Sequence, residues 1–377
     1  MIRDLRRAIP RAPLWVSAVA IVMTLAVVPP NAAARGVYRV AVTEDNVEDL
    51  AVAGGRVFWA TWGSTDASVF SSFPAGDQRR LLRVDAEPYD EVYPALWASA
   101  GRVAVQIEVY TAGIDEDYHD TIGRASAAVT SPRMTSFDDA DIGYERVQDV
   151  DGHRVLTTAD KQVRGRRTLQ VYVRDAASRV SVPRAIGPRV SLAAGAFAED
   201  VQARISGRHP AVLRARRITV FDLYTNQVKW SVRLPSRPTA SQSLQHDGGT
   251  AWDLAPDGTI AIARQMRESG PASRRNELGW APPFGHYRRL TGRVGVRRPF
   301  VLRNGSVTYV RPETRKAFRL VERSFGHPPR AITGKLPNES LVASDRDIVA
   351  AVVAGAGPTK CVLAAARPVT TSQRWKC

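Results

Sequence analysis

Seven apolar hairpins recur along the chain at similar spacing, and this repeat limits the possible folds more than any other feature. Each copy is an apolar strand, a turn, and a second apolar strand. The turns fall at Gly54-Gly55, Ala100-Gly101, Asp151-Gly152, Gly195, Asp257-Gly258, Asn304-Gly305 and Asp345-Arg346. Asn-Gly and Asp-Gly turns provide the positive φ angles that a two-residue hairpin needs. No long amphipathic helix pattern interrupts the series, so we predict an all-β chain.

A second strand pair follows several of these hairpins, as at Leu169–Ile186 and Ile218–Leu234. Four strands in a period of about 40–50 residues are typical of a β-propeller blade. We therefore predict a single propeller over residues 35–377, with seven blades, or six if one hairpin is a decoration. A β-sandwich is the competing fold, but seven similar periods do not suit one. The last repeat has too little chain after Ala354 for two good outer strands, so we predict that the unpartnered strand Val37–Val42 completes it and closes the ring.

The hairpin spacing resembles that of TolB-like and WD40-like propellers of secreted bacterial proteins over most of residues 37–366. This resemblance implies a scaffold that binds proteins or ligands more often than it catalyses a reaction. Two local motifs are similar to single propeller repeats. Asp222, Thr225 and Trp230 have the spacing of a tryptophan-docking repeat, and Asp247, Gly249 and Trp252 partly match an Asp box. Both resemblances imply structural roles, the first being a tryptophan packed between neighbouring blades.

Residues 1–34 have the pattern of a secretory signal peptide. Four arginines precede 15 uncharged residues, Leu14–Val28, and Ala32-Ala33-Ala34 fits the cleavage rule. The apolar run is short for a bilayer span of about 20 residues, although an uncleaved anchor is the alternative. No second run of membrane length follows. We expect a secreted or envelope-associated protein that is not transmembrane after cleavage.

Only two cysteines are present, Cys361 and Cys377. An exported protein reaches an oxidising compartment, where such a pair forms a disulfide. Two cysteines are too few for a four-thiolate zinc site. We therefore expect one disulfide that holds the C-terminus.

Charge is divided unevenly along the chain, which has a net charge of +16. Residues 35–151 hold 21 acidic and 10 basic side chains, whereas residues 152–377 hold 15 acidic and 39 basic ones. We predict a basic binding patch from the densest part, formed by Arg264, Arg267, Arg274, Arg275, Arg288 and Arg289. Export argues against nucleic acid as the partner. The expected partner is an acidic extracellular protein or envelope polymer.

Catalytic motifs are absent from the sequence, which contains neither HExxH nor GxSxG. We predict no catalytic residue and no cofactor. Asp115, Asp117 and Asp120 form an acidic cluster that could bind Ca²⁺, but the glycine-centred loop of an EF-hand is missing. The alternative function is a propeller hydrolase or lyase, metal-assisted, for an extracellular glycan or ester. Such an enzyme would gather acids and histidines from separate blades at the central channel.

Aromatic side chains offer further candidate contacts. Trp59 follows the first hairpin, and we expect it to pack between blades. Trp280-Ala281-Pro282-Pro283-Phe284 contains paired prolines, which keep it out of a central strand. This segment is therefore either a surface anchor or an inter-blade contact.

Overall fold

A computed structural model describes most of the chain after the predicted signal peptide. The described residues are 36–63, 66–73, 76, 78–85, 90–99, 102–111, 118–126, 134–136, 144–163, 166–175, 183–191, 201–214, 216–234, 250–267, 274–290, 294, 300–303, 305–314, 316–337, 340–345, 347–367 and 374–377. Arg35–Cys377 form one compact unit. The predicted signal peptide, residues 1–34, lies outside the described residues and stays a prediction.

In the described part of the chain, the secondary structure consists of strands arranged in seven antiparallel sheets, which we number as blades in chain order. Blade 1 contains β2 (Asn46–Ala53), β3 (Arg56–Trp62), β4 (Asp66–Ser72) and β5 (Arg79–Asp85). Blade 2 contains β6 (Asp90–Ser99), β7 (Arg102–Thr111), β8 (Tyr118–Ser126) and β9 (Met134–Ser136). Blade 3 contains β10 (Tyr144–Asp151), β11 (Arg154–Val163), β12 (Arg166–Asp175) and β13 (Arg184–Ser191).

The later blades follow the same order. Blade 4 contains β14 (Val201–Ser206), β15 (His209–Arg214), β16 (Arg217–Phe221) and β17 (Val228–Arg233). Blade 5 contains β18 (Thr250–Leu254), β19 (Ile260–Arg267), β20 (Arg274–Ala281) and β21 (Arg288–Leu290). Blade 6 contains β22 (Phe300–Arg303), β23 (Ser306–Pro312), β24 (Ala317–Ser324), β25 (Arg330–Ala331) and β26 (Leu336–Pro337). Blade 7 contains β27 (Val342–Ser344), β28 (Ile348–Ala354), β29 (Lys360–Ala366) and β1 (Tyr38–Thr43).

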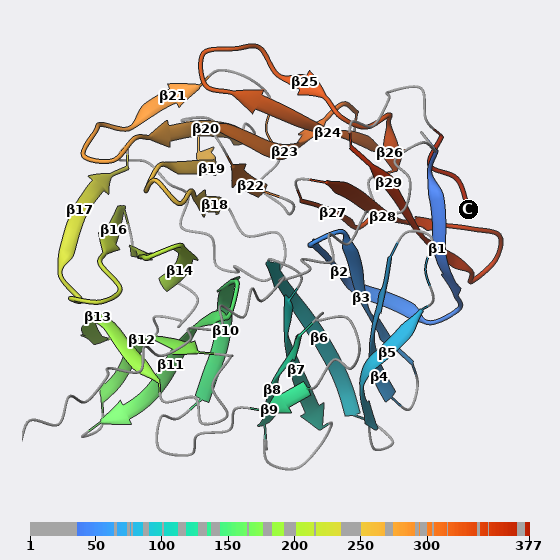
Figure 1. Cartoon of the computed structure of the whole chain (residues 1–377), viewed down its shortest axis with the longest axis horizontal. Helices are drawn as coiled ribbons and strands as arrows, with labels where there is room; N and C mark the ends of the chain where they lie inside the picture. The colour runs from blue at the N-terminus through green and yellow to red at the C-terminus, as the bar shows by residue number, and fades with distance from the viewer. Residues whose placement is uncertain are drawn as a thin grey trace, which may run out of the picture. The chain divides into compact units, whose positions relative to one another are not determined.

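The core lies between the blades rather than inside a single one. Each of seven buried apolar clusters joins two neighbouring blades, including blades 7 and 1. Trp59 is buried in the cluster between blades 7 and 1, and its ring stacks on Phe70 at 5.6 Å, so its predicted packing role is confirmed. The sheets therefore form a ring (Figure 1). This confirms the all-β propeller and agrees with seven blades rather than six.

The N-terminal strand closes the ring, as the sequence predicted. β1 pairs with β29 from Tyr38 opposite Ala364 to Thr43 opposite Lys360. Figure 1 shows β1, in blue, beside β29, in red. Pairing covers a sheet edge that would otherwise be open to other chains. The Cys361–Cys377 disulfide is also present and fixes the C-terminal residues to β29.

The hairpin of blade 4 differs from the prediction. The expected turn at Gly195 lies outside the described residues, but the residues on its two sides belong to different sheets, Val190 to β13 and Val201 to β14. The actual hairpin joins β14 to β15 and turns at Gly207, which has a φ of 58°. Pro210 follows this turn closely and weakens the strand pattern there, whereas the apolar run around Gly195 imitates a hairpin.

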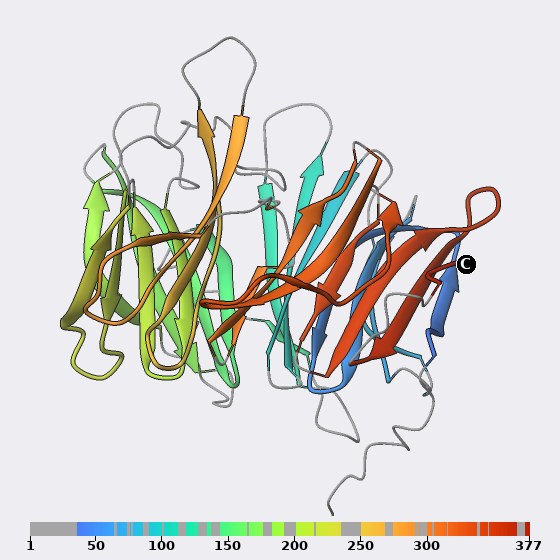
Figure 2. The same cartoon turned by 90° about the horizontal axis from the view of Figure 1, so that it is seen from above.

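Strands run between two ends of the ring, seen from the side in Figure 2. We call one end face A; it carries the turns between first and second strands and between third and fourth strands. Face B is the opposite end and carries the turns between second and third strands.

Among the described residues, no helix has the length and apolar character needed to cross a membrane.

Candidate functional site

Three aspartates occupy corresponding positions on the first strands of blades 1, 3 and 5. They are Asp49, Asp149 and Asp253, and each is preceded two residues earlier by Val or Ala and followed by Leu or Val. Their carboxylates accept hydrogen bonds from the backbone N–H groups of Leu96, Ile205 and Leu302, at 2.8, 2.8 and 2.7 Å. Each donor lies on the first strand of the next blade. First strands of neighbouring blades share no ladder, so these carboxylates satisfy backbone groups at the strand edges.

Arg204, on β14, places its guanidinium between the first strands of three consecutive blades. Its Nε donates to the carbonyl of Trp252 in blade 5 at 3.1 Å, and its Nη1 donates to the carbonyl of Gln148 in blade 3 at 2.9 Å. Burial raises the pKa of Asp149, although the Arg204 charge opposes this. Burial, followed by the nearby charge of Asp149, raises the pKa of Asp253 to about 7. The first strands of blades 3 to 5 thus bring two carboxylates, Asp149 and Asp253, near the Arg204 guanidinium. We call this region, together with Asp49, the ring centre.

A carboxyl group that titrates near pH 7 has the acidity required of a general acid or base. Asp253 also has a structural role, because its two oxygens accept backbone N–H bonds from Leu254 and Leu302. The ring of His209 lies 3.1 Å from the carbonyl of Pro256, beside a hairpin turn. Within the described ranges, no group of three or more His, Cys, Asp or Glu is arranged to hold a metal ion.

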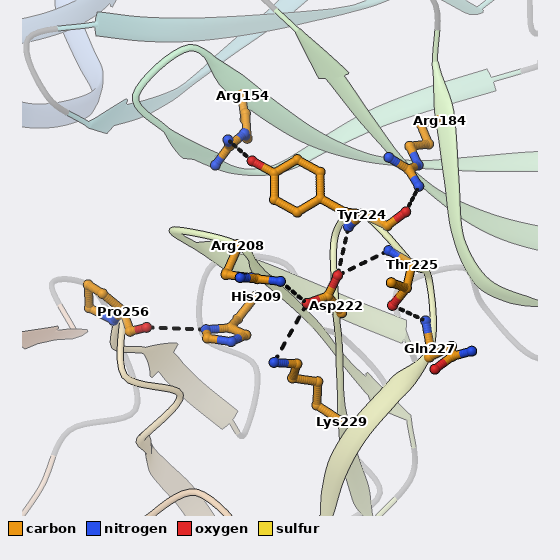
Figure 3. A network of polar contacts seen from close by, with 10 residues as sticks. All are labelled: Arg154, Arg184, Arg208, His209, Asp222, Tyr224, Thr225, Gln227, Lys229 and Pro256. Carbon is orange, nitrogen blue, oxygen red and sulfur yellow. Dashed lines mark hydrogen bonds and ion pairs between the residues drawn. The ribbon is translucent and has the colours of Figure 1, made fainter.

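On face A, the turn between β16 and β17 is built around the buried carboxylate of Asp222. It accepts the N–H groups of Tyr224 and Thr225, both at 3.0 Å, and pairs with Arg208 at 2.7 Å and Lys229 at 3.6 Å (Figure 3). The hydrogen bond from Thr225 and then that from Arg208 hold the pKa of Asp222 well below its usual range. The tryptophan-docking motif therefore begins with an aspartate that fixes a turn.

Trp230 completes this motif on β17. Its side chain is buried in the cluster between blades 4 and 5, which also contains Trp252. The packing role implied by the resemblance is therefore confirmed. Of the Asp-box residues, only Trp252 is described; it is buried and its Nε1 donates to Gln202 at 2.8 Å.

Large apolar side chains are exposed on this same face. Tyr224 is 58% exposed and Phe284 is 78% exposed, on corresponding turns of blades 4 and 5. Val228, at the start of β17, is 59% exposed. The Phe284 ring lies 6.4 Å from that of Trp230. The two ends of the Trp280–Phe284 segment differ: Phe284 is exposed on the turn, whereas Trp280 stacks on Phe325 in blade 6 at 4.3 Å. Trp280 and Ala281 belong to β20, which pairs with β19 and β21, so the paired prolines end this interior strand and do not exclude the whole segment from it.

Cationic side chains from two blades surround Tyr224. Arg154 Nη2 lies 3.5 Å from its hydroxyl, Arg184 donates to its carbonyl, and the Arg208 guanidinium lies 5.5 Å from its ring centroid. Figure 3 shows these contacts converging on one turn. We call this set of residues the face A patch: Arg154, Arg184, Arg208, Tyr224, Val228, Lys229 and Phe284.

The six arginines of the predicted basic patch lie on three strands of blade 5. Arg264 and Arg267 lie on β19, and Arg274 and Arg275 on β20, with Arg267 directly opposite Arg274; their side chains are outside the described part. Arg288 and Arg289 lie on β21, where Arg288 sits over the Trp280 ring at 5.5 Å and Arg289 is 3.3 Å from Glu277. About 20 Å of strand separates Arg274 from Trp280 at roughly 3.3 Å per residue. The register therefore spreads the predicted patch along the blade, with Arg264 opposite Glu277, between the Arg267–Arg274 pair and Arg288.

The predicted calcium ligands remain untested. Asp115 and Asp117 lie outside the described residues, and Asp120 lies on β8, where side chains are not described. The prediction of a Ca²⁺ site stays a prediction.

Sequence reasoning missed the aspartates of the ring centre and the arginines around Tyr224. The three aspartates are visible in the sequence, but their equivalent positions on the first strands can be recognised only when the hairpins are aligned correctly. Arg154 and Arg208 each follow the glycine of a first hairpin turn, in blades 3 and 4. Their proximity depends on blade order in space.

No protein-family model matches the chain, and no curated protein is significantly similar to it. Solved structures are similar in fold. An acylaminoacyl peptidase from Pyrococcus horikoshii aligns with 82% of this chain and 50% of its own length, at 10% identity and a TM-score of 0.53. The polysaccharide lyase Uly1 aligns with 85% of this chain and 89% of its own, at 9% identity and a TM-score of 0.50.

A WD40 domain from Toxoplasma gondii coronin is also similar, over 90% of this chain and 86% of its own, at 8% identity and a TM-score of 0.43. Identities this low show the fold alone. The chain is a β-propeller, and its solved neighbours include WD40 and other propeller domains. The TolB-like group is not singled out by these similarities.

Proposed function

We propose that the chain is a secreted β-propeller that works as a binding module, outside the cell or at the cell envelope, and that the face A patch contacts its partner. The observation that carries this proposal is the exposure of Tyr224 and Phe284 on adjacent turns. Exposed aromatic side chains near arginines are the residue types that dominate binding energy in protein interfaces. Export follows from the predicted signal peptide.

The charge of the patch favours an acidic partner. Arg154, Arg184 and Arg208 lie around Tyr224, and Lys229 lies on β17 beside the same turn. The nearby buried acid Asp222 pairs with Arg208 and Lys229 and offsets one of these four positive charges, which leaves the set with a net positive charge. Either an acidic protein or an acidic envelope polymer fits this surface.

A pull-down from the envelope fraction of the producing cell tests the proposal. The wild-type chain is compared with a Tyr224→Ala, Phe284→Ala double variant. The matched control is Val42→Ala with Phe73→Ala, which removes exposed apolar groups from blades 7 and 1. We expect wild type and control to retain the same partner and the double variant to lose it. Equal retention by all three would contradict the proposal.

The ring centre supports a second candidate, a hydrolase or lyase for an extracellular glycan or ester. Its supporting observation is Asp253, whose raised pKa places its titration near neutrality beside Asp149 and Arg204. The peptidase and the lyase similar to this chain support the fold only. Glycan and ester hydrolysis assays of wild type and Asp253→Asn distinguish the candidates. Activity that disappears in a folded Asp253→Asn variant would favour the enzyme.

A further inference from the structure

Four exposed arginines gather on face B of blade 4, away from the face A patch. Arg214 ends β15, Arg216 and Arg217 follow it, and Arg233 ends β17. In the strand register, Arg214 lies directly opposite Arg217, and Arg217 lies directly opposite Arg233. Directly opposed residues have Cβ atoms about 4.5–5.5 Å apart, so like charges there destabilise the sheet.

No acidic side chain relieves this repulsion in the described part of the chain, where none of the four forms an ion pair. Other arginines on the propeller are paired: Arg208 with Asp222, Arg289 with Glu277, and Arg311 with Glu313. The row on blade 4 is therefore an arrangement of positive charge that an external anion would stabilise.

A pocket of about 230 Å³ lies directly beside this row, between blades 3 and 4. Blade 3 contributes Leu169, Ile186 and Val190, and blade 4 contributes Val212 and Phe221. Arg214 and Arg217 line the same pocket. An apolar cavity and two guanidinium groups, which form no ion pair with a described residue, thus form one continuous site.

The backbone of blade 3 is irregular where it borders the pocket. The pairing of β12 with β13 shifts between Leu169 and Val171, and Gly187 has a φ of 66°. A Cβ atom at Gly187 would lie 2.8 Å from Cζ of Phe221, so glycine is needed for the ring to occupy this wall. The pocket is consequently shaped by a specific bulge and a specific aromatic ring.

The two halves of the site select the chemistry of a ligand. Guanidinium groups bind carboxylates and phosphates through paired, charge-assisted hydrogen bonds. Apolar walls favour a hydrocarbon group, and a cavity of about 150 Å³ already holds benzene. We propose that this pocket binds the apolar part of an anionic amphiphile, while Arg214 and Arg217 hold its carboxylate or phosphate head group. The site is separate from the face A patch.

Calorimetric titration with decanoate, below its micelle concentration, tests this site. Decanol serves as the uncharged probe and inorganic phosphate as the probe without a tail. We expect saturable binding of decanoate at one site and weaker binding of both other probes. An Arg214→Gln, Arg217→Gln variant should bind decanoate about tenfold more weakly or worse, since charge-assisted bonds are lost.

The matched control is Lys316→Gln with Arg330→Gln, which removes the same charge from exposed positions of blade 6. It should bind decanoate as the wild type does. A second variant, Val212→Phe, fills the pocket and should also weaken decanoate binding while leaving the arginines in place. Thermal melts check that every variant is folded. Removing the opposed arginines should not lower the melting temperature, because it removes repulsion.

Co-sedimentation with vesicles distinguishes two sources of the amphiphile. Binding to phosphatidylglycerol vesicles but not to phosphatidylcholine vesicles, with competition by decanoate, supports the site with a membrane lipid as ligand. Decanoate binding without vesicle binding supports it with a free amphiphile. Absence of saturable decanoate binding to wild type, or unchanged affinity in both the arginine and Val212→Phe variants, would overturn the proposal.

Discussion

Individual side chains link neighbouring blades through polar contacts as well as apolar ones. The aspartates of the ring centre bond to backbone groups of the next blade, and Arg204 contacts three first strands. On face A, Asn226 plays a similar part, since its Oδ1 accepts the N–H of Gly187 at 2.7 Å. These contacts fix the register between sheets that share no ladder.

The raised pKa of Asp253 makes the stability of the propeller depend on pH. Its folded pKa of about 7 exceeds the ordinary value of 3.8, so folding favours the protonated form. The stabilisation from the Asp253 carboxyl group is complete below pH 3.8 and is lost as the pH rises through about 7. Asp149 acts in the same direction.

Asp253→Asn removes this titration but leaves one oxygen for the two N–H donors, at a cost of about 1 kcal/mol at every pH. Urea unfolding at about pH 5 and about pH 8 measures the effect. We expect the variant to have a lower free energy of unfolding than the wild type at about pH 5. At about pH 8 this difference in free energy should become smaller or change sign. A difference in unfolding free energy that stays constant or grows with pH would contradict the raised pKa of Asp253.

Asn226 has a φ of 58°, a conformation that costs most side chains about 1–2 kcal/mol. Asn226→Gly relieves the strain but loses the bond to Gly187, whose net value is about 1 kcal/mol. Asn226→Ala loses the bond and keeps the strain. Denaturant titration should therefore show the Ala variant to be less stable than the Gly variant. Equal stabilities would mean that the turn does not impose this conformation.

At the scale of elements, the closing strand is the clearest case in which local pairing determines the state of the whole ring. β1 belongs to the same sheet as β27, although the first residues of the two strands, Tyr38 and Val342, are 304 positions apart (342 − 38). β1 also places Ala41 in the cluster shared with blade 1. The disulfide acts on the same blade, since Cys361 lies on β29.

Deletion of residues 36–43 should lower the melting temperature and increase aggregation. The reason is that β29 becomes an open edge that can pair with other chains. A synthetic peptide of residues 36–43 is the control, because it can add to that edge and restore the melting temperature. A truncated protein as stable and soluble as wild type would show that β1 does not close the ring in solution.

Cys377→Ser should reduce the free energy of unfolding by about 3 kcal/mol, as expected for a crosslink across a loop of roughly 15 residues. Cys377 is exposed, so the substitution itself removes little packing. Reductant should destabilise the wild type by the same amount and leave the variant unchanged. Two reactive thiols in the native exported protein would contradict this.

At the scale of the whole molecule, the sequence predicted the architecture better than the site. Hairpin turns and apolar strands are local signals, so the repeat, the closing strand Val37–Val42 and the disulfide could all be anticipated. The turn at Gly207 was missed because the apolar run around Gly195 has the composition of a hairpin. The face A patch was missed because Arg154 and Arg208 come from different blades and meet only in the folded ring.

The uneven distribution of charge along the sequence becomes a distribution over different blades of the ring, because consecutive blades are neighbours. Blade 1 and the loop before it carry the exposed acids Glu44, Asp45 and Asp85, together with the exposed Arg79 and Arg80 on β5. Blade 4 carries exposed arginines on both faces, including Arg208 and Arg217. Contacts made by such exposed charges weaken at high salt, where the screening length falls to about 3 Å at 1 M.

Photo-crosslinking in the producing cell tests the proposed binding surface most directly. A photoreactive phenylalanine replaces Phe284 in one variant and the exposed Val42, on β1, in the other. We predict a discrete crosslinked product from position 284 and none from position 42. Products of equal yield from both positions, or a product from position 42 alone, would contradict the account that face A of blades 4 and 5 is the binding surface.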